Sequence, residues 1–111
     1  MTRDERHKYE YDVEVGSDTA GGHVLRLAGS NKRVLEIGAG PGSITRVLRD
    51  AGNCRVTALE IDPAAIEKLK PYCERVYSVD LNDANWGAAL DAEPRFDVIV
   101  AADVLEHLYD P

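Results

Sequence analysis

The chain has 111 residues, of which 44% are hydrophobic and 30% are charged, proportions that are ordinary for a globular protein. Its formal net charge is −7, because 20 acidic side chains outnumber 13 basic ones, and the basic residues form no cluster. Since proteins that bind nucleic acid generally present a basic face, and membrane spans need about 18 apolar residues in a row, we expect neither nucleic acid nor a membrane as a partner.

The first 30 residues are expected to form a segment of their own with one helix. Residues 1–16 are polar, with Tyr9 and Tyr11 among them, and residues 18–27 are predicted to be helical with an interruption at Gly21 and Gly22. Glycine is a poor helix former, so a pair of glycines indicates a break in the helix.

A strand, a glycine turn and a helix follow in immediate succession. The apolar run at 33–37 predicts a buried strand, Gly38, Gly40 and Gly42 stand at alternate positions, and 43–51 is amphipathic at helical spacing. In this arrangement a small polar or anionic ligand meets the beginning of a helix. Glycine suits such a turn because a side chain would block the ligand's approach to the backbone. An ordinary strand-to-helix turn is the alternative.

The spacing of the glycines distinguishes between ligands. A dinucleotide fingerprint needs glycine at the first, third and sixth positions of the turn, but here Ser43 occupies the sixth. The glycines fall at the first, third and fifth positions, and Glu36 lies two residues before the first of them. This pattern resembles the first motif of class I S-adenosylmethionine-dependent methyltransferases. A nicotinamide-dependent oxidoreductase is a less favoured alternative.

Strands and helices alternate along the rest of the chain. The expected elements are strands at 55–60, 75–79 and 96–101 and helices at 63–70, at about 83–90 and from about 103 onward. Alternation of this kind predicts an α/β fold with parallel strands and right-handed crossovers.

Each of the later strands ends in an acidic residue. Glu60 ends the second strand, 18 residues after Gly42, where a carboxylate can accept two hydrogen bonds from a ribose diol. Asp80 follows the third strand and Asp103 the fourth. Any one of these acids could simply cap a helix. Their shared position at successive strand ends favours a ligand site, because ligands of open α/β sheets bind along that edge.

The resemblance to the methyltransferase family extends from Arg33 to Pro111. The run Asp103-Val-Leu-Glu-His-Leu108 is similar to the fourth motif of members that methylate small molecules. The resemblance implies S-adenosylmethionine as the cofactor, with S-adenosylhomocysteine as the product.

The resemblance also implies a role for each position that matches. The glycine turn would pass close to the methionine part of the cofactor, the motif acid would hold its amino group, often through water, and the later strand ends would bind ribose and adenine. The implied cofactor-binding residues are Glu36, Gly38, Ala39, Gly40, Gly42, Glu60, Ile61, Asp80, Leu81, Ala102 and Asp103.

The family also implies the overall arrangement. We expect a Rossmann-like, doubly wound parallel sheet that is partial, with strand order 3-2-1-4 and the family's later strands absent. Residues 1–30 would carry a helix that covers the cofactor cleft, and residues 31–111 would be the S-adenosylmethionine-binding domain. The apolar strand at 96–101 would then lie at an open edge, so we expect these residues alone to self-associate and to be a fragment, or a naturally short form, of a larger enzyme.

The methyl acceptor is expected to be a small molecule, since the fourth motif lacks the Asn/Asp-Pro-Pro-Tyr/Phe pattern of DNA amino-methyltransferases. No catalytic residue is identified, although His107 is a candidate general base. A non-catalytic cofactor-binding subunit is an alternative.

Cys54 and Cys73 have no Cys-x-x-Cys spacing, so we expect both to be free thiols and expect no zinc site. Free thiols match a reducing compartment, and the N-terminus is too charged for a secretory signal, so we expect a cytoplasmic location.

Overall fold

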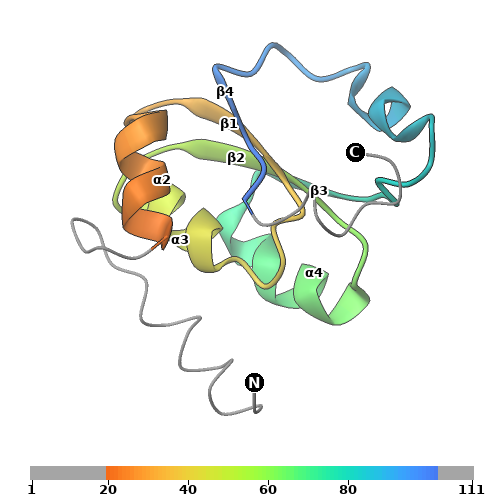
Figure 1. The fold of residues 1–111 in the computed structure, drawn as a ribbon, viewed down its shortest axis with the longest axis horizontal. Helices are drawn as coiled ribbons and strands as arrows, with labels where there is room; N and C mark the ends of the chain where they lie inside the picture. The colour runs from red at the N-terminus through yellow and green to blue at the C-terminus, as the bar shows by residue number, and fades with distance from the viewer. Residues whose placement is uncertain (1–19, 103–111) are drawn as a thin grey trace.

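Residues 20–102 are described by the structure, a computed structural model, and they form a parallel sheet with helices packed against it (Figure 1). Tyr9, Tyr11, Asp103 and His107 lie outside these residues. The elements in chain order are α2 (Ala20–Ala28), β1 (Arg33–Ile37), α3 (Ser43–Asp50), β2 (Arg55–Glu60), α4 (Pro63–Leu69), the 3-10 helix η1 (Lys70–Tyr72), β3 (Arg75–Ser78), the 3-10 helix η2 (Trp86–Leu90) and β4 (Val98–Val100).

The sheet has the order β3-β2-β1-β4, and all of its pairs are parallel. This confirms the predicted α/β fold and the predicted strand order. Right-handed crossovers from β1 to β2 and from β2 to β3 move in the same direction, so they place α3 and α4 on the same side of the sheet. Figure 1 shows α2 on that side as well, and we call it the helix face. The chain then returns past β2 and β1 to reach β4, so the strand order reverses at β1.

The main core lies between the sheet and the helix face. Val34 and Val56 are in register, and Val100 lies two residues beyond Val98, the register partner of Val34, so all three side chains point to this side, where they are buried. Leu25 of α2 and Leu48 of α3 pack against them in one apolar cluster. Removal of this apolar surface from water is the main source of stability, at about 25 cal/mol per Å².

Helices α3 and α4 and strand β3 each end one residue earlier than predicted, and three other elements differ more from the sequence prediction. Helix α2 continues through Gly21 and Gly22, because burial of Leu25 and Ala28 against α3 and the sheet outweighs the low helix propensity of two glycines. The helix expected near 83–90 is the short 3-10 helix η2, which buries no side chain and therefore gains nothing by extension. Strand β4 begins at Val98, two residues later than predicted.

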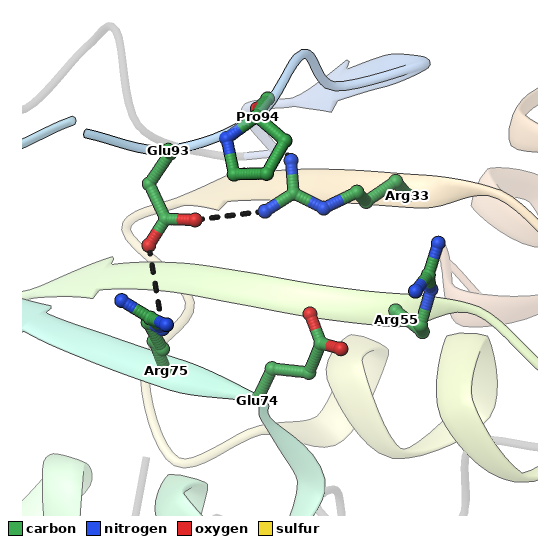
Figure 2. Close-up of a pocket in the computed structure, with 6 residues that line it drawn as sticks. All are labelled: Arg33, Arg55, Glu74, Arg75, Glu93 and Pro94. Atoms are coloured by element: carbon green, nitrogen blue, oxygen red, sulfur yellow. Dashed lines mark hydrogen bonds and ion pairs between the residues drawn. The ribbon is translucent and has the colours of Figure 1, made fainter. Parts of the chain in front are cut away.

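The late start of β4 is explained by Arg33, which holds the preceding loop. Its guanidinium group forms an ion pair with Glu93 at 2.8 Å, donates to the carbonyl oxygens of Pro94 and Arg95, and lies 4.5 Å from the centre of the Phe96 ring. Figure 2 shows Glu93 reaching both Arg33 and Arg75. The loop is thus fixed on the side of the sheet opposite the helix face before it enters β4.

We expect Arg33→Lys to lower the free energy of unfolding by about 1–2 kcal/mol. Lysine keeps the charge but lacks the planar fork that serves three acceptors at once. Urea unfolding measures the effect, and Arg49→Lys is the matched control because the ion pair of Arg49 with Asp50 is exposed. Equal effects of the two substitutions would contradict the structural role of Arg33.

Candidate cofactor site

The glycine turn connects the carboxyl end of β1 to the beginning of α3. Gly38, Gly40 and Gly42 have φ angles of 67°, 60° and 99°, a region that other L-residues rarely adopt. The amide groups of Gly38 and Ala39 donate to the Leu59 carbonyl at 2.9 and 3.3 Å, which attaches the turn to β2. The backbone conformation therefore requires the glycines that the sequence pattern singled out.

Two of these glycines have different surroundings. A Cβ atom at Gly42 would lie 3.3 Å from Leu69 Cδ1 and 3.4 Å from Tyr72 Cδ2, so this glycine allows α4 and η1 to pack closely. A Cβ atom at Gly40 would meet nothing within 4 Å. The turn therefore faces open space at Gly40, where a ligand can approach its backbone.

The carboxylate of Glu60 lies against the turn from the end of β2. Its Oε1 atom accepts a hydrogen bond from the Gly40 amide at 2.7 Å, and its Oε2 atom accepts from the amides of Ile61 and Asp62 at 3.1 and 3.0 Å. Two positions 20 residues apart in the sequence are thereby brought into contact. Asp62 in turn accepts from the Ala64 amide at 3.0 Å and caps α4.

A pocket of about 160 Å³ opens beside this contact at the carboxyl edge of β1, β2 and β3. Of the residues singled out from the sequence, Gly38, Glu60, Ile61, Asp80 and Leu81 line it. Asp80 also accepts a hydrogen bond from the Asn82 amide at 2.9 Å, the local turn that short acidic side chains often form.

Glu36 lies beneath the turn rather than on its surface. It is in register with Ala58 and Val100 and therefore points to the helix face, and only 3% of its surface is exposed. The hydroxyl group of Thr45 in α3 donates to its Oε1 atom. Burial raises the pKa of Glu36 to about 7, with a further rise from Glu60 and an opposing effect of the Thr45 hydrogen bond.

Thr45 is a site residue that sequence reasoning missed. It is completely buried, although it is polar and lies between the apolar residues of α3. A polar residue at a core position of an amphipathic helix was the available signal, because a buried hydroxyl group needs a partner.

Ala102, which follows β4, and α2 line a second pocket. Ala102 lines an apolar pocket of about 280 Å³ between α2 and β4, together with Leu27 and Ile99. Within residues 20–102, α2 packs against α3 and β4 on the helix face. Asp103 and His107 lie outside the described part of the chain.

Both cysteines are free thiols. Cys54 is buried, and burial together with the nearby Glu36 raises the pKa of Cys73 to about 12. No helix among the described residues is long and apolar enough to cross a membrane.

The chain belongs to the methyltransferase domain family, whose model matches residues 35–111. A curated relative, ribosomal RNA small subunit methyltransferase A of Jannaschia sp. (strain CCS1), is 40% identical over 77 residues, which cover 62% of this chain and 27% of the relative. The chain thus spans about a quarter of the length of that relative.

Solved structures agree on the fold. A TehB-like SAM-dependent methyltransferase from Corynebacterium glutamicum matches with a TM-score of 0.58 and 28% identity, over 78% of this chain and 46% of that one. A SAM-dependent methyltransferase from Thiobacillus denitrificans, in complex with S-adenosyl-L-homocysteine, matches with a TM-score of 0.57 and 16% identity, over 94% and 44%. These comparisons confirm the predicted family and support S-adenosylmethionine as its cofactor.

The expectation that nucleic acid is excluded as a partner is wrong. Three matching relatives, at 40–46% identity, are ribosomal RNA methyltransferases. A net charge of −7 is a sum over the chain and does not report the charge of one face. It also says nothing of the greater part of each relative's length, which has no counterpart in this chain.

Proposed function

We propose that this chain is the cofactor-binding part of an S-adenosylmethionine-dependent methyltransferase. The observation that carries the proposal is the contact between Glu60 and the Gly40 amide at the carboxyl edge of the sheet. A carboxylate suited to a ribose diol and a glycine turn with open space before it thereby lie side by side, which supports the proposal. The residues present therefore fit this cofactor.

In the proposed complex, Glu60 accepts hydrogen bonds from the ribose hydroxyls. Ile61, Asp80 and Leu81, which line the same pocket, bind the adenine ring. The backbone of the glycine turn receives the methionine part, and Glu36 beneath it supplies negative charge for the amino group.

The bound cofactor supplies an electrophilic methyl group on a sulfonium centre. The described residues bind and orient it, and proximity and orientation of this kind contribute up to about 7–11 kcal/mol to lowering the barrier. None of residues 20–102 is proposed as a general base.

Ribosomal RNA is the acceptor that the curated relatives favour. Their identity of 40–46% is higher than that of the solved structures reported above, and each is named as a ribosomal RNA methyltransferase. An acceptor in the ribosome would also place the protein in the cytoplasm.

A small-molecule acceptor is the second candidate, and a specific feature of the sequence favours it. Residues 103–108 read Asp-Val-Leu-Glu-His-Leu, which resembles the fourth motif of small-molecule methyltransferases. This segment follows β4 in the sequence.

A binding experiment tests the cofactor proposal. In calorimetric titration we expect S-adenosylhomocysteine to bind and NADH not to bind. Binding of NADH with equal or higher affinity would overturn the proposal.

Glu60→Gln should weaken S-adenosylhomocysteine binding by roughly 1.5–3 kcal/mol, the usual contribution of hydrogen bonds to a charged group. The amide also replaces one oxygen that now accepts from the backbone, which disturbs the turn as well. The variant should no longer prefer the ribose diol over a 2′,3′-dideoxy analogue. Glu67→Gln is the matched control, since Glu67 is exposed on α4. An unchanged preference for the diol would place ribose recognition elsewhere.

The acceptor is tested with a radiolabelled methyl group on the cofactor and the whole protein as the enzyme. Label that enters small-subunit ribosomal RNA and is released by ribonuclease supports the first candidate. Label that enters only the low-molecular-weight fraction of a cell extract supports the second.

A further inference from the structure

Glu36 and Thr45 form a buried polar pair directly beneath the glycine turn. Glu36 is 3% exposed and Thr45 is fully buried, and the Thr45 hydroxyl donates to the Glu36 carboxyl. The pair joins the last part of β1 to the first turn of α3, the two elements that hold the glycine turn between them. A change in this pair therefore acts at the base of the proposed methionine subsite.

No basic group within residues 20–102 is among the causes that shift the pKa of the Glu36 carboxyl. The ionisable groups that act on it there are Glu60 at the end of β2 and the thiol of Cys73 after η1, and neither is basic. A buried carboxylate without a cation is costly, so burial favours the protonated form. A pKa of about 7 means that the protonated and the ionised form are both present near neutral pH.

Thr45 and Glu60 shift the pKa of the Glu36 carboxyl in opposite directions. The Thr45 hydroxyl stabilises the ionised form by its hydrogen bond, whereas Glu60 destabilises it by charge repulsion. An ammonium group brought to the turn would favour the ionised form further, since an opposite charge within a few ångströms does so.

We propose that Thr45 is a positioning residue for Glu36, and that Glu36 releases its proton when the ammonium group of a ligand binds at the glycine turn. This inference rests on the proposed function and concerns the same site. In the exchange, the Glu36 carboxylic acid becomes a carboxylate, its proton goes to solvent, and the ligand's ammonium keeps its three hydrogens. Thr45 contributes because its hydroxyl remains a donor to the carboxylate formed.

The inference predicts a pH-dependent affinity for ligands that carry the amino acid part. S-adenosylhomocysteine should bind about tenfold more tightly at pH 7.5 than at pH 6, because less Glu36 must be deprotonated. Its binding at pH 6 should release nearly one proton, measured by calorimetry in two buffers of different ionisation enthalpy. 5′-Methylthioadenosine, which lacks the amino acid part, should bind with little pH dependence and release no proton.

Thr45→Val removes the hydroxyl group and keeps the shape. It should displace the rise in S-adenosylhomocysteine affinity to higher pH and weaken binding at pH 7 at least threefold. Thr45→Ser should restore the parent profile. The affinity for 5′-methylthioadenosine should stay within twofold of the parent in both variants. Binding of this ligand therefore also shows that the site of each variant has folded.

The outcomes separate this inference from the proposed function. If neither ligand binds the parent protein, the proposed function and this inference both fail. If both bind but S-adenosylhomocysteine shows no pH dependence and no proton release, only this inference fails. An unchanged pH profile in Thr45→Val would overturn the role of Thr45, and the proton measurement on the parent does not depend on that variant.

Discussion

Gly40→Val should abolish cofactor binding, with a loss of affinity of more than a hundredfold. Two physical effects combine at this position. The φ of 60° is unfavourable for a β-branched residue, and the added side chain would occupy the open space through which a ligand reaches the turn. Calorimetric titration with S-adenosylhomocysteine measures the loss.

Gly29→Val separates these two effects. Gly29 has a φ of 84° at the end of α2, and an added Cβ would meet only the flexible end of Lys32 at 3.4 Å. Both substitutions should therefore lower the free energy of unfolding by about 1–2 kcal/mol through the left-handed conformation. Only the substitution at Gly40 should affect binding. Affinity of Gly40→Val within a few-fold of the parent would contradict the site assignment.

The central strands were predictable because their local signals agree with their surroundings. The sequence predicts β1 and β2 with the bounds observed, since both are apolar runs bordered by turn residues and buried in the middle of the sheet. At β4 the prediction began two residues too early and ended one residue too late, and the early start was wrong because the side-chain contacts of Arg33 take Phe96 out of the strand. Such a contact joins positions more than 60 residues apart, and periodicity cannot report it.

The site residues also fall into those that the sequence predicts and those that depend on tertiary packing. Motif spacing identified the glycine turn and Glu60, and the structure brings Gly40 and Glu60 into hydrogen-bond contact. Spacing did not show that Glu36 is buried on the helix face beneath the turn. Nor did it show Thr45 as its donor. Both facts depend on how α3 packs on β1, which is a tertiary property.

Glu36→Gln should make the protein more stable than the parent at pH 8 and should weaken cofactor binding. The pKa of Glu36 rises from its ordinary value of 4.5 to about 7 on folding, so the folded state holds a proton between these pH values when the unfolded state has lost it. The stability that this proton contributes is fully present below pH 4.5 and is lost as the pH rises through 7. Glutamine has no proton to lose, so it avoids the buried charge.

The informative quantity is the difference in unfolding free energy between Glu36→Gln and the parent, because other titrating groups cancel in it. Between pH 5 and pH 8 this difference should shift in favour of the variant by about 2–3 kcal/mol, at 1.36 kcal/mol per pKa unit. Urea unfolding at several pH values measures it, and Glu67→Gln, exposed on α4, should show no such trend. A difference that does not change with pH would mean that Glu36 titrates as an ordinary carboxyl. A gain in stability accompanied by a loss of S-adenosylhomocysteine affinity would instead show that this buried acid is retained for binding at the expense of the fold.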